Sequence, residues 1–196
     1  MMLNRFIIII LVLFSACNNN KKASVLDSTD ITQQVKKEDT VTNFFPVTSF
    51  LKGEIFGIKT GGITPVKKTT INNKTDSVYL KEVDFENSFA EFLSPVIDTS
   101  NLKNSFTEKR FLDQTLNAFT FTYDPADGKE NIFAFKHWDV YVDPETNKVR
   151  RVYLTKNIAA DTQLLMTWQS GKWCKIITVN NSVIVKEEKI SWSYVE

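Results

Sequence analysis

His137 is the one histidine of the chain, and it stands two residues before Asp139 and six before Asp143. In an extended strand these three side chains share one face, because strand side chains alternate between faces. An imidazole beside a carboxylate can form a base and the acid that orients it, the pairing that hydrolases use to activate a nucleophile. No Gly-x-Ser-x-Gly motif accompanies the group in the sequence. We therefore expect a solvated strand face opposite a hydrophobic face that carries Trp138. A hydrolase that uses His137 with nearby carboxylates is kept as an alternative.

Other residues that could do chemistry are expected to have structural roles. Asp143 precedes Pro144, and no Asp-x-Asp-x-Asp-Gly loop supplies the set of oxygen ligands that calcium needs, so Asp143 is predicted to start a turn. Cys174 lies in a β-rich run and is predicted to be a small packed side chain. A single histidine cannot supply a multi-histidine metal site. We expect neither a metal nor a cofactor.

Trp168 and Trp173 stand on either side of the turn residues Gln169–Lys172. A simple closure of this four-residue loop would pair the two tryptophans on one face of a hairpin. With neighbouring lysines they could then form an aromatic surface that stacks on sugar rings. A carbohydrate-binding module is therefore a further alternative, although tryptophans on a β-meander more often belong to a core.

The composition narrows the class of protein. The chain has 196 residues, of which 42% are hydrophobic and 24% are charged, as in ordinary globular proteins. The 24 Lys plus Arg against 23 Asp plus Glu leave a formal charge of +1. This balance argues against a strongly basic nucleic-acid binder, and no nucleic-acid partner is expected.

The N-terminal segment has the order of a secretory signal peptide. A short basic start and a nine-residue apolar run are followed by two small residues and Cys17. This segment resembles the lipobox of bacterial lipoproteins, although Phe14 stands where Leu is commonest. The resemblance implies removal of residues 1–16, acylation of Cys17 and attachment to a membrane through the lipid anchor. Asn18 after the cysteine implies the outer membrane of a Gram-negative cell envelope, on its periplasmic or its surface face.

The composition changes abruptly after the signal peptide and again at Phe44. Residues 18–43 hold no aromatic residue, glycine or proline. Such a segment buries too little apolar surface to offset the entropy of ordering it. Residues 17–43 are therefore predicted to be the lipidated cysteine and a flexible polar tether, with a short amphipathic helix near Ile31–Val35 as the alternative. All aromatic residues outside the signal peptide lie in 44–196, which is predicted to be a single globular domain.

The domain is predicted to be α+β. An apolar face after Pro46 indicates a helix that ends at Gly61-Gly62. A second helix is expected from Asp84, as its N-cap, towards Pro95. The remainder is expected to be mostly strands and hairpins, with a C-terminal meander, which indicates an antiparallel sheet with the two helices packed on it. Residues 140–150 resemble hairpins of periplasmic lipoprotein carriers and lipoprotein-sorting folds, and this resemblance implies a curled sheet.

The predicted hairpin registers place apolar side chains on both faces of the sheet. With a second turn at Asn180-Asn181, one face would carry Leu164, Ile177 and Ile184 beside the tryptophan pair. Such a sheet could be covered on both sides by its own chain, could line a cavity, or could bury its second face in a homodimer or against a partner protein. We therefore expect a non-catalytic binding or scaffold module for a partner protein or an apolar ligand.

Overall fold

The computed structural model describes residues 44–130 and 133–192, with the side chains of residues 100 and 101 left aside. Cys17, the signal peptide and the predicted tether lie outside the described residues. The described residues all belong to the compact unit Val41–Glu196. Its elements are α1 (Val47–Thr60), β1 (Val66–Ile71), β2 (Lys74–Tyr79), the 3-10 helix η1 (Glu82–Asp84), α2 (Phe85–Leu93), α3 (Thr99–Leu102), β3 (Phe106–Asp113), β4 (Ala118–Pro125), β5 (Phe135–Val142), β6 (Val149–Ala159), β7 (Thr162–Gln169), β8 (Trp173–Asn180) and β9 (Val183–Ser191).

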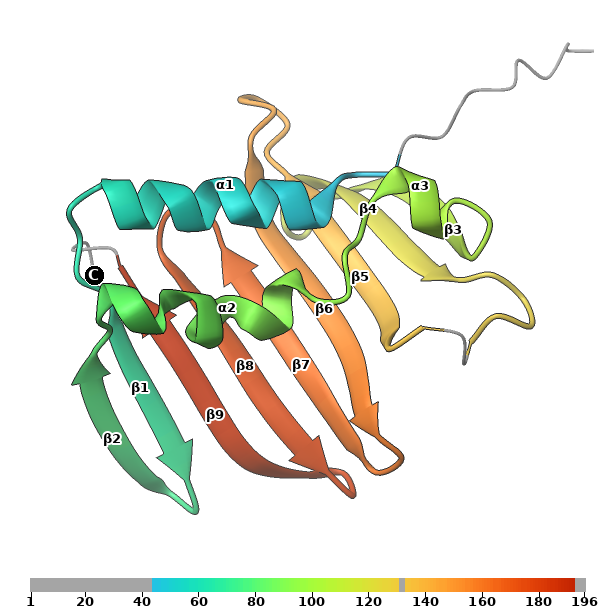
Figure 1. Ribbon diagram of the computed structural model, residues 1–196. Helices are drawn as coiled ribbons and strands as arrows, with labels where there is room; N and C mark the ends of the chain where they lie inside the picture. Colours follow the sequence, from blue (N-terminus) through green and yellow to red (C-terminus); the bar gives the residue numbers. More distant parts are fainter. Residues whose placement is uncertain (1–43, 131–132, 193–196) are drawn as a thin grey trace, which may run out of the picture. The chain divides into compact units, whose positions relative to one another are not determined.

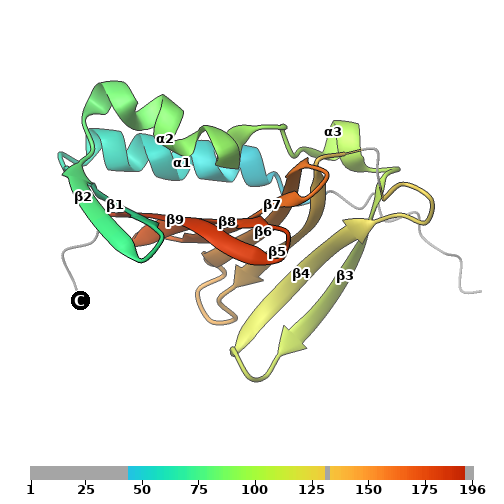
Figure 2. The same ribbon diagram turned by 90° about the horizontal axis from the view of Figure 1, so that it is seen from below.

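The nine strands form one antiparallel sheet in the order β2-β1-β9-β8-β7-β6-β5-β4-β3 (Figure 1). Strands β3 to β9 follow one another as a meander, and the β1–β2 hairpin extends the sheet beyond β9. Helices α1 and α2 both lie on the same face of the sheet (Figure 2). The predicted α+β class, with an antiparallel sheet and two principal helices, is confirmed.

The predicted curling of the sheet is wrong, because the sheet is neither closed nor strongly curled. Closure would require the two edge strands to pair with each other. Here β2 and β3 stand at opposite ends of the strand order. The helix layer instead covers the hydrophobic face, so the sheet has buried that face without closing on itself.

The two helices begin and end close to the predicted positions. In α1, Val47, Leu51 and Ile58 are buried at helical spacing, and the helix ends before Gly61. In α2, Phe85, Phe89 and Phe92 are buried. The predicted cap Asp84 occupies the N-cap position but makes no side-chain capping hydrogen bond, because it is also the last residue of η1.

Aromatic rings fill the layer between the helices and the sheet. Trp168 of β7 lies 5.4 Å from the ring of Phe92, 5.6 Å from that of Phe89 and 5.0 Å from that of Trp192, measured between ring centroids. All four rings are 0–5% exposed. Large rings dominate the burial energy of a core of this kind. This cluster therefore holds α2 on the centre of the sheet.

The register of the β7–β8 hairpin differs from the prediction by one residue, and that of the β8–β9 hairpin differs by two or three. Trp168 pairs with Cys174, and Gln169 pairs with Trp173, because the turn holds three residues with Gly171 at φ +69°. The next turn is Asn181-Ser182, where both residues have positive φ, as a type I′ turn requires. A shift of one residue exchanges the two faces of a strand. The pairings predicted for these hairpins are therefore wrong.

In the observed register, apolar side chains gather on the face that the helices cover. Across β6, β7, β8 and β9 this face carries the row Val152, Trp168, Cys174 and Ile190. All four residues are buried. The opposite face is mixed, with Thr167, Lys175 and Lys189 on one row and Leu165 opposite Ile177 on the next, so the prediction of apolar side chains on both faces holds in part.

Truncating the ring of Phe92 should destabilise the domain. We expect Phe92→Ala to lower the free energy of unfolding by about 3–5 kcal/mol, because it removes a buried ring and leaves a cavity beside Trp168. Urea unfolding followed by circular dichroism measures this. Phe56→Ala in α1 is the matched control: that ring is 67% exposed, and we expect a change of at most about 0.5 kcal/mol. Equal losses for the two variants would contradict the assignment of the core.

Candidate functional site

His137 lies between two carboxylates on the face of the sheet away from the helices. Its Nδ1 is 2.8 Å from Oδ1 of Asp124, and its Nε2 is 3.0 Å from Oδ2 of Asp139. Asp139 also accepts hydrogen bonds from the hydroxyls of Thr122, at 2.6 Å, and Tyr141, at 3.1 Å. The antiparallel pairing of β4 with β5 sets Thr122 opposite Asp139 and so aligns the group.

The electrostatics of this cluster favour a charged imidazole. The hydrogen bond to Asp139 raises the pKa of His137, burial opposes it, and the bond to Asp124 adds to it, so that the pKa rises to about 9. Burial is the largest influence and raises the pKa of both carboxyls, but the hydrogen bond and charge of His137, together with Lys109 at Asp124 and Thr122 at Asp139, outweigh it, so that both pKa values lie below the ordinary value. Near neutral pH the cluster is an imidazolium held by two carboxylates.

This geometry does not favour the hydrolase alternative. A general base needs an unprotonated nitrogen within reach of the proton that it removes. Both nitrogens of His137 already donate to carboxylates, and the raised pKa keeps them protonated. The arrangement instead joins β4 to β5 through charged hydrogen bonds.

The structure separates Asp143 from His137 and Asp139. Oδ1 of Asp143 accepts hydrogen bonds from the backbone N–H of Glu145, at 3.0 Å, and of Thr146, at 2.9 Å. These hydrogen bonds lower the pKa of Asp143, and the bond from the backbone of Thr146 has the largest effect. The prediction that Asp143 starts a turn is confirmed. Asp124, which takes the second place beside His137, was missed, because only the pairing of β4 with β5 brings it there.

The predicted aromatic surface of Trp168 and Trp173 does not form. Trp168 is fully buried on the helix face, and its Nε1 donates to Oε2 of Glu54 in α1 at 3.3 Å. Trp173 is half-buried on the opposite face, where Nζ of Lys189 lies 5.2 Å from its ring centroid. The physical reason is the one-residue register shift described above.

Cys174 is a free, buried thiol, as predicted for a small packed side chain. Its side chain is 1% exposed, and burial raises its pKa far above the ordinary value. A thiol reacts as the thiolate, which this environment disfavours.

Two charged residues that fix the helices were not recognised in the sequence. Lys156 of β6 is 7% exposed, and its ammonium donates to the backbone oxygens of Glu91, at 3.3 Å, and Ser94, at 2.7 Å, and to the side chain of Glu91. These oxygens lie at the C-terminal end of α2, where a cation is favourable. Glu54 fixes α1 on the sheet: its carboxylate accepts hydrogen bonds from Nε1 of Trp168 and from the N–H of Gly171, the latter at 3.1 Å. Both contacts join residues far apart in the sequence, so no local pattern signals them.

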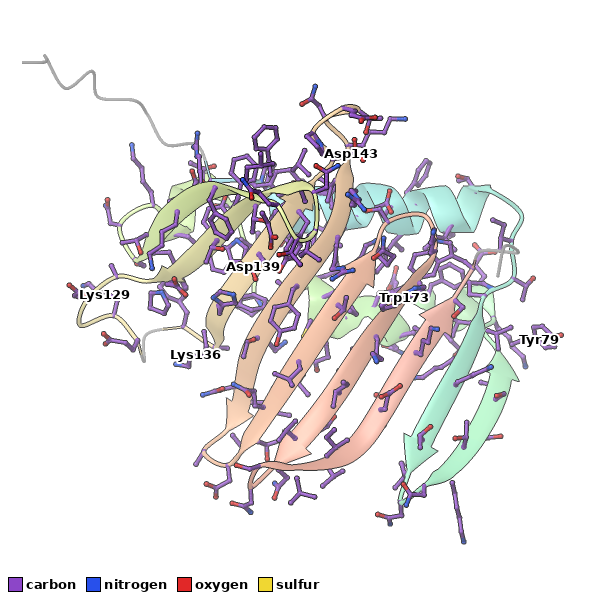
Figure 3. All side chains as sticks on the ribbon, turned by 180° about the vertical axis from the view of Figure 1, so that it is seen from behind. Tyr79, Lys129, Lys136, Asp139, Asp143 and Trp173 are labelled. Atoms are coloured by element: carbon purple, nitrogen blue, oxygen red, sulfur yellow. The ribbon has the colours of Figure 1, made fainter. Side chains whose placement is uncertain are left out.

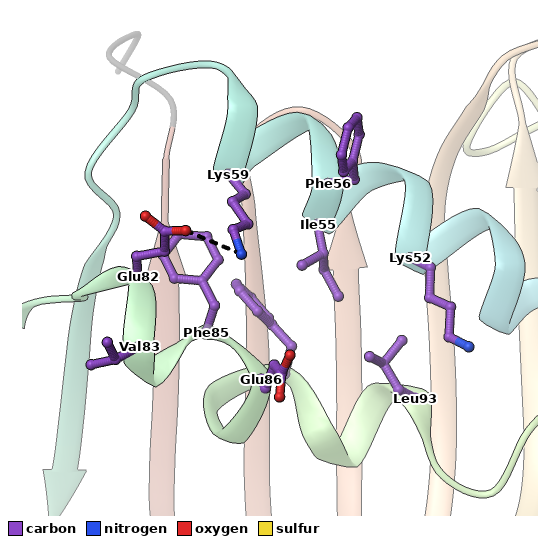
Figure 4. A pocket seen from close by; sticks show the side chains of 10 residues that line it. Lys52, Ile55, Phe56, Lys59, Glu82, Val83, Phe85, Glu86 and Leu93 are labelled. Atoms are coloured by element: carbon purple, nitrogen blue, oxygen red, sulfur yellow. Dashed lines mark ion pairs between the residues drawn. The ribbon is translucent and has the colours of Figure 1, made fainter.

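An open groove runs between α1 and the η1–α2 segment, with a volume of about 560 Å³ (Figure 4). Ile55 of α1 and Leu93 of α2 point towards each other across it. Its rim carries Phe56, which is 67% exposed, and Val83, which is 82% exposed. Lys59 and Glu82 form an ion pair of 3.1 Å across one end. The groove combines an apolar lining with a charged rim.

Over residues 44–130 and 133–192, no group of His, Cys, Asp and Glu side chains could hold a metal ion. Within the same ranges, no helix is both long and apolar enough to cross a membrane.

The stability of the domain should decrease at alkaline pH because of His137. The pKa of His137 is raised from 6.5 to about 9 in the folded state. Its contribution to the free energy of unfolding is therefore complete below pH 6.5 and is lost as the pH rises through 9. After allowance for solvent screening, we expect the wild type to lose about 1–2 kcal/mol more than His137→Gln between pH 6 and pH 10. Urea unfolding at both pH values measures the difference. If the free energy of unfolding fell equally with pH in the two proteins, an imidazolium held by two hydrogen bonds would be contradicted.

No protein-family model, no curated protein and no solved structure matches this chain.

Proposed function

We propose that this protein is a lipoprotein of the Gram-negative outer membrane whose globular domain binds an amphipathic segment of a partner protein without catalysis. The order of residues in the N-terminal segment, up to the lipobox residue Cys17, supports the anchor. The groove between α1 and the η1–α2 segment carries the proposal of binding.

The groove has the chemistry of a helix-binding site. Amphipathic helices lay an apolar face into a hydrophobic groove, with charged residues along its edges. Here Phe56 and Val83 are exposed beside an apolar lining to which Ile55 contributes. Large exposed apolar side chains that cluster around one groove commonly mark interaction sites.

The charges along the groove suggest the orientation of its occupant. Lys52 and Lys59 extend from α1, whereas Glu82 and Glu86 extend from the opposite wall. A bound segment would therefore carry acidic side chains on the edge that meets α1 and basic side chains on the other edge.

An apolar small molecule is the second candidate occupant. The volume of about 560 Å³ lies in the range of ligand pockets. Native mass spectrometry of the purified chain would reveal a co-purified ligand as a discrete added mass that Val83→Asp removes.

A photo-crosslinking phenylalanine analogue at position 56 should capture the partner in intact cells. We expect one discrete crosslinked protein from position 56 and none from position 111, whose ring is 50% exposed at the far edge of the sheet. Val83→Asp should reduce the crosslinked yield roughly tenfold, because an apolar contact of about 1.5 kcal/mol is lost. Val183→Asp, at a 62% exposed hairpin position, is the matched control and should leave the yield unchanged. No crosslink from position 56, or equal effects of the two valine variants, would refute the groove as the binding site.

Cys17→Ser tests the anchor separately. We expect intact-mass analysis of the native protein to show acyl chains on Cys17. We expect the serine variant to leave the membrane fraction, since two or more chains are needed for stable attachment. A mature protein without acyl mass on its first residue would overturn the lipoprotein assignment and leave the groove proposal standing.

A further inference from the structure

We propose that the helix-free face of the sheet binds an anionic polysaccharide along the row Lys68, Lys189 and Lys175. Figure 3 shows this face, with Trp173 and Asp139 on it. The inference is independent of the groove, which lies on the helix side of the sheet.

The three lysines are direct cross-strand neighbours. Lys175 of β8 pairs with Lys189 of β9, and Lys189 pairs with Lys68 of β1. Side chains directly opposite each other in antiparallel strands lie close together, and like charges in such pairs are destabilising. A row of three is therefore unfavourable unless negative charge is supplied to it.

The chain supplies little of that negative charge. Lys175 has an acidic partner, Glu187, at 3.8 Å, and Lys189 lies over the ring of Trp173. Lys68 is exposed, and no hydrogen bond or ion pair joins its ammonium group to another side chain in the described part of the chain. One carboxylate thus faces three ammonium groups.

The covered face of the same strands gives the opposite picture. There Glu188 accepts both Lys67 and Lys186, each at 2.8 Å. Adjacent strands can therefore neutralise their lysines where the fold requires it. Each of these two lysines has an ion pair with a carboxylate, whereas on the face that is open to solvent only Lys175 has one.

The surroundings of the row suit a carbohydrate. Tyr153 and Thr167 continue the same row across β6 and β7, and Trp173 and Gln169 form a cross-strand pair two positions along their strands from Lys175 and Thr167. Aromatic rings stack on sugar rings, while hydroxyl and amide groups bind sugar hydroxyls.

The shape of the row favours a polymer. From β6 to β1 the row crosses five adjacent strands, or roughly 19 Å at the usual strand spacing. A linear glycan with an acidic group on successive sugars would place its negative charges along the lysines. Its sugar rings would then lie beside Tyr153 and Trp173.

Binding of polygalacturonate to the full chain tests the proposal, with neutral dextran as the uncharged comparison. Trp173 is half-buried, whereas the other three tryptophans are 0–5% exposed, so intrinsic fluorescence should report binding through Trp173. We expect saturable binding of polygalacturonate that weakens with salt, and none of dextran. Absence of binding to polygalacturonate, or equal binding of dextran, would overturn the proposal.

The double variant Lys68→Gln/Lys189→Gln should weaken this binding roughly fivefold, since each exposed charge contributes modestly. Its melting temperature should stay unchanged or rise, because the like-charge contact is relieved. Lys129→Gln/Lys148→Gln removes the same charge from exposed loops and should leave the affinity unchanged. Equal weakening by the two double variants would show an effect of net charge alone and refute the row as the site.

Two other anions separate the glycan from its competitors. Phosphatidylglycerol vesicles and a single-stranded oligothymidylate carry similar charge without sugar acids on a glycan chain. We expect both to bind more weakly than polygalacturonate. Equal or tighter binding of either, with the same sensitivity to Lys68→Gln/Lys189→Gln, would overturn the assignment to a polysaccharide.

Discussion

The register of the C-terminal hairpins is the constraint on which the rest of this domain depends. The turn through Gly171 and the turn at Asn181-Ser182 fix it, because each requires residues with positive φ at defined positions. Given that register, Trp168 faces the helices and Trp173 faces away. The hydrophobic core and the row of Lys68, Lys189 and Lys175 follow from this one assignment of faces.

The two helices are held on the sheet by aromatic packing and by the polar contacts of Lys156 and Glu54. Phe89 and Phe92 place α2 over Trp168, and Lys156 fixes the end of that helix. Glu54 ties α1 to the β7–β8 turn. Both helices pack against the same face of the sheet, and the groove lies between them. Its exposed apolar rim contributes little to folding, which is consistent with a role in binding.

The helix-free face is divided into two parts with different electrostatics. Near β4 and β5, Asp124 and Asp139 neutralise the imidazolium of His137, so the charges of that part are satisfied within the chain. Near β8, β9 and β1, three neighbouring lysines share one carboxylate. The cluster around His137 joins β4 to β5, whereas the lysines have positive charge that an anionic ligand could neutralise. The same face therefore combines a structural cluster with a candidate anion-binding surface.

The sequence by itself determined the α+β class, the two principal helices, most of the strands and the turn at Asp143. These features depend on local periodicity and turn chemistry, which neighbouring residues encode. The tertiary structure alone decided the open shape of the sheet, the burial of Trp168, the clamp of Asp124 on His137 and the groove. Each of these depends on which residue of one strand lies opposite which residue of another, or on contacts such as Lys156 to Ser94 between distant segments. A turn shorter by one residue moves every side chain of a strand to the other face, and residue types alone do not fix that count.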